Sequence, residues 1–363
     1  MTRKHTVLLA VAANSVETPA AQQTLQRAAD VLRAGGTVAF PTETVYGLGA
    51  NALDARAVER IFLAKQRPAW DPLIVHVSEA TMLGQVAADI PARAQKLMDA
   101  FWPGPLTLLL PKTDAIPAAV TSGRSLVGVR IPAHPVARAF IEAAGVPVAA
   151  PSANRFGHTS PTNAQHVLDD LDGRIDLVLD AGPTPHGIES TVIEVGESAV
   201  IVYRPGAISV EEIEAVAGPV VLHQARDRNL NLAIENAAEV GHPSSLPSPG
   251  VGIRHYAPRA RVVLVETAAE EDSHPQWVQA LREHSSNRVG VMLPDGWRLP
   301  GEFFGVHYAW GNWRSDRELA KRLFSGLRAL DVMGADVILC PLPGNDGLGA
   351  ALRDRLRKAA REE

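Results

Sequence analysis

The chain has 363 residues, a length that suggests two domains when a domain averages roughly 150 residues. Hydrophobic residues make up 46% and charged residues 21%, so most of the chain can bury a core, and disorder over most of its length is excluded. The formal net charge of −5 argues against a protein that coats nucleic acid through bulk charge. An anionic ligand therefore needs a local cluster of cations.

The single cysteine, Cys340, excludes an internal disulfide and a cysteine-based zinc site, and it favours a reducing cytoplasm. No stretch approaches the roughly 18 apolar residues of a membrane helix, so no membrane association is expected. Residues 6–13 are expected to form an early strand or a disordered lead-in.

The region up to residue 216 predicts helices and strands in irregular alternation, which favours an α/β or α+β sheet of mixed direction over a doubly wound one. Amphipathic patterns predict helices over residues 22–35, 55–66, 92–101, 135–144, 163–171 and 210–216. Short apolar runs predict strands over residues 37–40, 73–77, 106–110, 126–131, 146–150 and 177–180, and a β-pair over 191–195 and 199–204.

Residues 223–258 are rich in proline, serine and glycine, which predicts a tether without regular structure. Beyond it, strands are expected over 261–266, 288–293 and 336–339, with helices over 275–284, 317–330 and 350–360. This alternation predicts a mostly parallel, Rossmann-like βαβ unit. The expected organisation is a larger domain over 15–210, an irregular linker over 211–259, and a smaller Rossmann-like domain over 260–363.

Several polar segments follow predicted strands, where sheet proteins place ligands. Residues 41–49 follow the strand over 37–40 and offer hydroxyls and a flexible backbone to a small polar ligand, or form only a tight loop with capping threonines. Arg130 and Arg204 each end a predicted strand and leave a cation at the sheet terminus.

Lys65 and Arg67 lie at the end of a predicted helix, before Pro68. They could grip a polyphosphate, or the lysine could simply complement the helix dipole. Residues 151–154 and 160–162 offer small hydroxyls and backbone N–H groups in the manner of an anion nest, although the second segment could merely cap the following helix.

Familiar catalytic templates are missing from the sequence. It has no Gly-x-Ser-x-Gly elbow, no Walker-type phosphate loop and no His-Glu-x-x-His motif. The residues alone therefore indicate only a phosphate-bearing small ligand held by Arg, Lys and Ser or Thr.

Nine short motifs, in order across residues 20–207, closely resemble the YrdC-like threonylcarbamoyl-AMP synthases. They occupy residues 40–52, 65–68, 72–77, 102–107, 129–135, 150–154, 160–162, 189–191 and 204–206. The tether that ends at 254–258, followed by a small Rossmann-like tail, looks like the longer two-domain form. The resemblance implies a YrdC-like open twisted mixed sheet with a concave basic face.

That family makes L-threonylcarbamoyl-adenylate and pyrophosphate from L-threonine, bicarbonate or CO2, and ATP, a nucleotidyl transfer. The product supplies the threonylcarbamoyl group of the adenosine beside the anticodon of tRNA, which a downstream tRNA transferase attaches. The resemblance further implies that Mg²⁺ enters with the ATP phosphates and that no protein metal site is needed. Direct tRNA contact stays open, as does the role of residues 261–363 in docking or in stabilising a closed lid.

The resemblance also assigns roles to individual residues. The expected catalytic pair, Lys65 and Arg67, would bind the triphosphate. The other expected ATP residues are Leu126, Ser152, Asn154, Ser160, Arg204 and Tyr256, the last as part of a lid. The expected threonine residues are Thr42, His76, Arg130, Ala149 and Ser190, with Arg130 facing the substrate carboxylate.

Val251, Gly252 and Ile253 stand where the family usually has a methionine and a basic-aromatic pair, which leaves their lid contacts undefined. Phe156 replaces a common serine. The alternative function is a non-catalytic RNA-binding or regulatory module of the same fold, which predicts loss of the Lys65/Arg67 or the Ser152/Asn154 pair. All four residues are present. A carbamoyl-adenylate-forming module of hydrogenase maturation is excluded, because it carries cysteine-rich zinc regions that one cysteine cannot supply.

Overall fold

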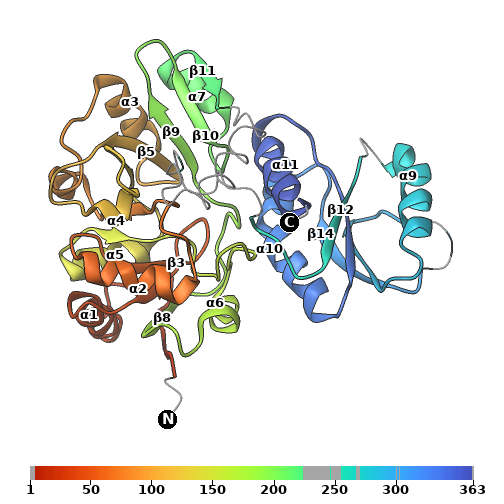
Figure 1. Ribbon diagram of the computed structural model, residues 1–363, viewed down its shortest axis with the longest axis horizontal. Coiled ribbons are helices and arrows are strands. Elements are labelled where there is room, and N and C mark those ends of the chain that lie inside the picture. The colour runs from red at the N-terminus through yellow and green to blue at the C-terminus, as the bar shows by residue number, and fades with distance from the viewer. Residues whose placement is uncertain are drawn as a thin grey trace, which may run out of the picture. The chain divides into compact units, whose positions relative to one another are not determined.

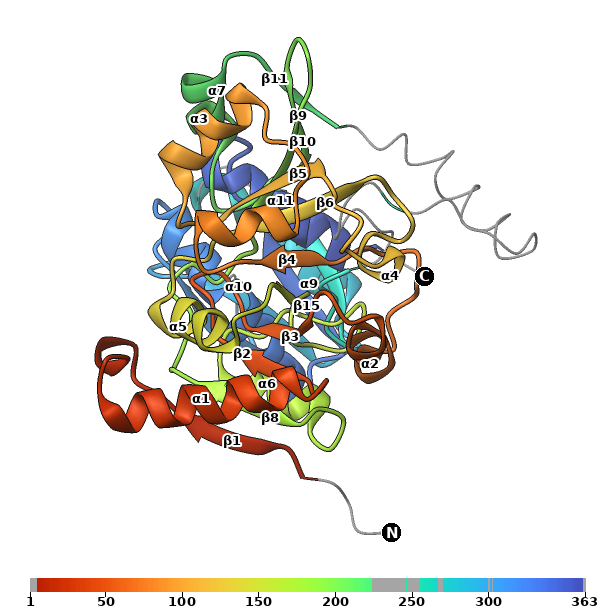
Figure 2. The ribbon, with the colours of Figure 1, turned by 90° about the vertical axis from the view of Figure 1, so that its left-hand side faces the viewer.

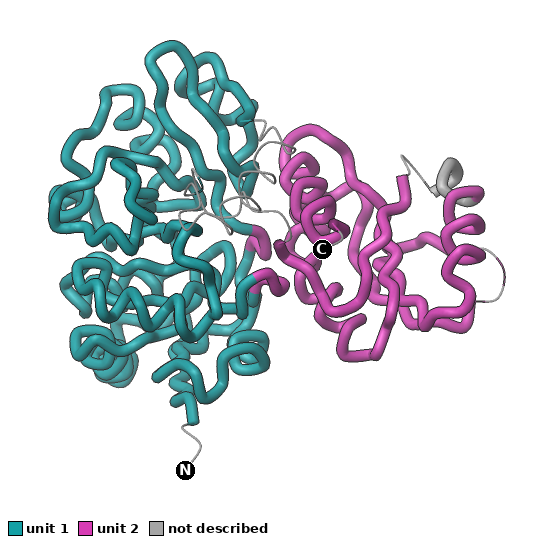
Figure 3. The backbone as a smooth tube through the Cα atoms, in the orientation of Figure 1, with its two compact units in different colours: residues 1–156, 161–185, 189–252 teal, residues 157–160, 186–188, 253–363 magenta. Residues whose placement is uncertain are grey.

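The computed structural model describes residues 5–223, 246, 255–266, 270–299, 301 and 303–361 (Figure 1). The chain divides into two compact units (Figure 3). Unit 1 comprises residues 1–156, 161–185 and 189–252, and unit 2 comprises 157–160, 186–188 and 253–363. The second unit thus includes two short stretches from within the N-terminal region. The lid residues 251–253 lie outside the described part of the chain.

Unit 1 is built on one mixed sheet, which confirms the predicted sheet of mixed direction (Figures 1 and 2). The order of its described strands is β1-β8-β2-β3-β7-β4-β6-β5-β9-β10-β11. Their bounds are β1 (Val7–Ala10), β2 (Val38–Phe40), β3 (Gly47–Asn51), β4 (Ile74–His76), β5 (Leu106–Pro111), β6 (Leu126–Arg130), β7 (Val148–Ala149), β8 (Leu177–Asp180), β9 (Thr191–Val195), β10 (Val200–Arg204) and β11 (Val220–Leu222). The pairs β4/β6 and β5/β9 are parallel, whereas β4/β7, β5/β6 and β9/β10 are antiparallel.

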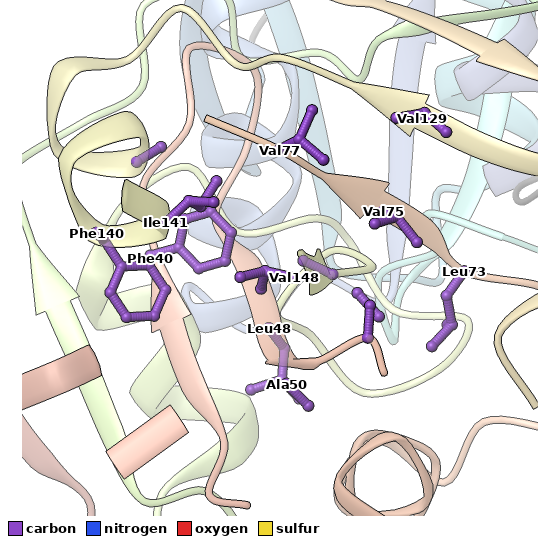
Figure 4. Close-up of a cluster of buried hydrophobic side chains, with 14 of the residues drawn as sticks. Phe40, Leu48, Ala50, Leu73, Val75, Val77, Val129, Phe140, Ile141 and Val148 are labelled. Atoms are coloured by element: carbon purple, nitrogen blue, oxygen red, sulfur yellow. The ribbon is translucent and has the colours of Figure 1, made fainter. Parts of the chain in front are cut away.

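The helices of unit 1 bury apolar faces in one main core, part of which Figure 4 shows. They are η1 (Ala13–Ser15), α1 (Pro19–Arg33), α2 (Ala55–Lys65), η2 (Ala80–Gln85), α3 (Ala92–Phe101), α4 (Ala118–Thr121), α5 (Pro135–Ala144), α6 (Ala164–Leu171) and α7 (Val210–Ala217). In α1, Leu25, Ala28, Ala29 and Leu32 recur at helical spacing and are all buried. Helix α7 confirms the helix predicted over 210–216, whereas strand β11 falls within the range predicted as an irregular linker.

Alternation of side chains separates the two faces of strands β4 and β6. In β4 and its flanks, Leu73, Val75 and Val77 point into the main core, while Ile74 belongs to a separate small cluster with Leu109 and Val192. In β6, Val129 (Figure 4) and Val127 likewise belong to the core. Because successive side chains of a strand point to opposite faces, His76 and Arg130 project from the face away from the core. These two predicted site residues therefore share that face.

Strand β3 was not predicted, because the sequence suggested a loop over residues 41–49. Gly47 and Gly49 have low β-propensity, so the sequence of β3 does not look like a strand, but these glycines suit the position of β3 in the sheet. A Cβ atom on Gly49 would lie 2.7 Å from Cγ1 of Val148 and 2.9 Å from Cε1 of Phe40. The chain can pass between these two side chains only where it has none of its own.

Unit 2 contains a second sheet with the strand order β12-β15-β13-β14, and all its pairs are parallel, as predicted. The strands are β12 (Arg261–Val265), β13 (Val289–Pro294), β14 (Val306–Gly311) and β15 (Val337–Pro341), and the helices are α9 (Glu270–Glu283), α10 (Asp316–Val332) and α11 (Gly347–Ala359). Strand β14 was not predicted from its mixed polar and aromatic sequence. Among the described residues, no helix is both long and apolar enough to cross a bilayer.

Candidate substrate site

Several of the predicted site residues of unit 1 lie on strands of the mixed sheet. Ala149 of β7 pairs with Val75, and the next residue of β4, His76, pairs with Arg130 of β6. Further along the sheet, β9 begins directly after Ser190, and β10 ends at Arg204. The sheet order β7-β4-β6-β5-β9-β10 thus gathers residues that are up to 128 positions apart, from His76 to Arg204.

Arg130 has a partner at each of its three guanidinium nitrogens. Its Nη2 lies 2.5 Å from Oε1 of Glu43, its Nη1 donates to Oγ1 of Thr44 at 3.1 Å, and its Nε donates to the carbonyl of Gly104 at 3.1 Å. Both charged side chains are buried, at 4% and 5% exposure. The result is a fixed ion pair with a positive and a negative end.

Thr42 and Thr44 organise the turn that carries Glu43. The two hydroxyl oxygens are 2.8 Å apart, and Oγ1 of Thr42 donates to the carbonyl of Val45 at 2.7 Å. The same oxygen accepts from the backbone N–H groups of Thr44 and Val45. Thr42 therefore holds the turn in a shape that presents Glu43 to Arg130, in addition to any substrate contact.

His76 is an uncharged neighbour of this ion pair. Burial, together with the positive charge of Arg130, lowers the pKa of His76 from 6.5 to about 3. The imidazole is consequently neutral at physiological pH and can both donate and accept a hydrogen bond.

Arg204 and Ser190 form a second buried group. The guanidinium of Arg204 donates through Nη2 to the carbonyl and to Oγ of Ser190, at 2.9 and 3.0 Å. The Ser190 hydroxyl in turn lies 2.8 Å from Oγ1 of Thr107 on β5. This chain of contacts connects the predicted ATP residue Arg204 to the predicted threonine residue Ser190.

Asp71 connects the cations that were predicted to bind the triphosphate. Its Oδ2 lies 2.9 Å from Nη2 of Arg67, and both side chains are almost fully buried. Burial raises the pKa of Asp71, and the positive charges of Arg67, Lys65 and Arg204 act in the opposite direction. An electrostatic influence from all three cations on one carboxylate places them in one region of unit 1.

Lys65 ends α2, and Gln66 follows it in the left-handed conformation, with φ of 56°. The Nζ atom donates to the carbonyls of Ser152 and Asn154, at 2.5 and 2.6 Å. Burial and the charge of Arg67 lower the pKa of Lys65 well below its usual value. The structure therefore joins the predicted Lys65, Ser152 and Asn154 around one ammonium group.

Four predicted ATP or threonine residues occupy other positions. The side chain of Leu126, at the start of β6, packs against the small apolar cluster of the site face. The side chain of Ala149 lies in the main core, while its backbone pairs with Val75 beside His76. Ser160 and Tyr256 belong to unit 2, whereas the group around Lys65 belongs to unit 1.

Comparisons with known proteins cover nearly the whole chain. A family model described as "Telomere recombination" matches residues 30–206, and one described as the C-terminal domain of threonylcarbamoyl-AMP synthase matches residues 208–361. The threonylcarbamoyl-AMP synthase of Pyrococcus abyssi is 42% identical over 334 residues, which cover 92% of this chain and 93% of the relative. The chain belongs to the threonylcarbamoyl-AMP synthase family.

Other relatives of this family match to a similar extent. The threonylcarbamoyl-AMP synthase of Bacillus subtilis is 40% identical over 342 residues, with 93% of this chain and 92% of the relative covered. A crystal structure of P. abyssi Sua5 in complex with L-threonine matches 98% of each chain at 40% identity, with a TM-score of 0.85. The expected family and the YrdC-like fold are thereby confirmed.

Sequence reasoning missed three side chains of this synthase-family site: Glu43, Asp71 and Thr107. Each lies within or beside a motif that supported the resemblance, but none had been given a role. A threonine inside the apolar run 106–110 was the available signal for Thr107, because a polar residue there must face away from the core. The partners of Glu43 and Asp71 come from tertiary contacts.

Proposed function

We propose that the protein is an L-threonylcarbamoyl-AMP synthase that converts L-threonine, bicarbonate or CO2, and ATP into L-threonylcarbamoyl-adenylate and pyrophosphate. This reaction would be the first step of threonylcarbamoyl modification of the adenosine beside the tRNA anticodon, completed by a downstream transferase. The observation that carries the proposal is the buried Arg130–Glu43 pair in the same unit as a group of three cations around Asp71, namely Lys65, Arg67 and Arg204.

Opposite charges at the Arg130–Glu43 pair complement a zwitterionic amino acid. Arg130 would face the carboxylate of threonine, and the carboxylate of Glu43 would face its ammonium group. Neutral His76 and the hydroxyl of Ser190 supply polar groups for the substrate hydroxyl. Before the substrate binds, Arg130 and Glu43 neutralise each other. Substrate binding would replace this ion pair by two others, one between Arg130 and the threonine carboxylate and one between Glu43 and the threonine ammonium group.

The chemistry also explains why the site contains several cations and needs no nucleophile. The threonine amine, once deprotonated, adds to CO2 and gives a carbamate. A carbamate oxygen then attacks the α-phosphorus of ATP, and the bond to the pyrophosphate oxygen breaks as pyrophosphate leaves. Lys65, Arg67 and Arg204 would stabilise the charge that develops on the phosphates.

Magnesium would enter with the ATP phosphates and neutralise part of their charge. Across the described residues, no group of three or more His, Cys, Asp or Glu is placed to hold a metal ion. The charge that the protein itself offers to the phosphates would come from Lys65, Arg67 and Arg204. Their partners in this structure include backbone carbonyls, Asp71 and Ser190.

Pyrophosphate release from ATP tests the proposal, measured with and without threonine and with and without bicarbonate. We expect release only when both are present, together with a threonylcarbamoyl-adenylate product identified by mass spectrometry. Lys65→Ala should abolish the release, whereas Lys96→Ala, which removes an exposed lysine of α3, should preserve it. Release that is unchanged when threonine is withheld would refute the proposed reaction.

A further inference from the structure

One face of helix α10 contacts three segments that are far apart in the sequence. Ala320, Phe324 and Arg328 are spaced by four residues and therefore lie on the same side of the helix. Their partners are Gly187, Tyr256 and Thr159, and all six residues belong to unit 2. Each of the three segments contains or closely precedes a predicted substrate-binding residue.

The first contact holds the loop of residues 157–160. Nη2 of Arg328 donates to the carbonyl of Thr159, the residue before the predicted ATP residue Ser160. The end of the predicted lid also contacts this loop. The N–H of Ala257 donates to the carbonyl of Gly157 at 2.9 Å, and Ala257 forms a parallel β-bridge with His158.

The second contact fixes Tyr256. Its backbone has φ of 65°, a left-handed conformation that a tyrosine adopts only where its surroundings impose it. The ring stacks on Phe324 with centroids 5.7 Å apart and planes inclined by 25°, and the guanidinium of Arg355 in α11 lies 5.0 Å from the ring centroid. The side chain is only 1% exposed.

The third contact is between backbones. Gly187 has φ of +70°, and a Cβ atom placed on it would lie 2.5 Å from Cα of Lys321 and 2.7 Å from the carbonyl oxygen of Ala320. Only glycine permits this approach. Ser190, the predicted threonine residue, follows Gly187 by three positions.

We propose that α10 is the element by which the C-terminal domain sets the positions of the substrate-binding segments, and that Arg328 is a positioning residue for ATP. The inference rests on the proposed function, because the substrates that it assigns are those of that reaction. Arg328 acts through the loop 157–160 and Phe324 through Tyr256, so both residues would affect the binding of ATP. Gly187 acts through Ser190 and would affect the binding of threonine.

The test compares Arg328→Ala and Arg328→Gln with wild type in threonine-dependent pyrophosphate release and in calorimetric binding of a non-hydrolysable ATP analogue. We expect the KM and Kd for the nucleotide to rise about tenfold, as the loss of one charged hydrogen bond would produce. The KM for threonine should change less than about twofold, since the proposed role is local. Gly187→Ala should give the opposite pattern, with a raised KM for threonine.

Arg322→Ala is the matched control. This arginine lies on the same helix but pairs with Glu318 and lies over the ring of Tyr308, so both substrate constants should stay at the wild-type values. Nucleotide constants within twofold of wild type in both Arg328 variants, or an equal loss for both substrates, would overturn the inference. A wild-type protein that needs no threonine would instead overturn the proposed reaction, and the two failures are thus distinguishable.

Discussion

Glu43 and Arg130 form a buried ion pair in which the carboxylate oxygen lies 2.5 Å from Nη2. Breaking such a pair leaves a charge in a medium that solvates it poorly, so both partners are kept in place. The pair also has an unusual location, at the end of β6 and in the turn after β2, on the site face of the sheet. A substrate with two opposite charges can replace both halves of this interaction at once.

Glu43→Gln tests the threonine site. The amide is nearly isosteric but neutral, so it can no longer attract an ammonium group, and we expect the KM for threonine to rise at least about tenfold. ATP affinity should stay close to wild type. Steady-state pyrophosphate release at varied threonine measures the first quantity, and Glu59→Gln on the exposed side of α2 is the control. An unchanged threonine KM would remove Glu43 from the site.

Asp71→Asn tests the buried cation cluster. Arg67 would lose its paired carboxylate, and Lys65 and Arg204 would lose a nearby negative charge. We expect the free energy of unfolding to fall by about 3–5 kcal/mol. Urea unfolding followed by circular dichroism measures it, with the exposed Asp114→Asn as control. A loss below about 1 kcal/mol would place the pair in the class of surface salt bridges.

The lowered pKa of Lys65 predicts that ATP binding is coupled to proton uptake. Burial and Arg67 lower the pKa of Lys65 in the free protein, whereas a polyphosphate beside Nζ would raise it again. Binding at a pH between the lowered pKa of the free protein and the raised pKa of the complex should therefore take up protons, to at most about one per site. Calorimetric titrations in buffers of different ionisation enthalpy measure this uptake. Lys65→Gln should lose it and Lys96→Ala should keep it; proton release by wild type would contradict the assignment.

His76 predicts a pH dependence of stability. The folded protein keeps this imidazole neutral down to about pH 3, while the unfolded chain binds a proton below its ordinary pKa of 6.5. The unfolded state thus holds more protons between these values, so the free energy of unfolding falls as the pH drops from 6.5 toward 3. His76→Asn should flatten this slope by up to about 1.4 kcal/mol per pH unit. The exposed His5→Asn should leave the slope unchanged, and an equal slope in His76→Asn would contradict the shift.

Long periodic segments were predictable because their signal is local. Helix α1 and the strands β4, β5 and β6 appear within a few residues of the expected ranges, since their apolar spacing alone defines them. Strand β3 escaped prediction because its glycines carry no β-propensity, and because Val148, which leaves no room for a Cβ atom on Gly49, comes from a distant part of the chain. Its glycines carry information only in that context.

The same distinction applies to the site. Motif resemblance identified the cations Lys65, Arg67, Arg130 and Arg204, but it gave no partner for any of them. Those partners include Glu43, Asp71, the hydroxyl of Ser190 and several carbonyls, and the sheet order decides which of them meet. A single sequence does not contain that order.

The alternation of the central strands also has a use in redesign. Positions 74, 76, 128 and 130 lie on the face of the proposed site, while 73, 75, 127 and 129 lie in the main core, so the two sets can vary separately. A library restricted to the first set, with Arg130 retained, would explore recognition of other amino acids without loosening the scaffold. Gly128 is the most constrained of these positions, because a Cβ atom there would lie 3.3 Å from Cγ2 of Thr107. A paired Thr107→Ser substitution would remove that methyl group and make room for a side chain at position 128.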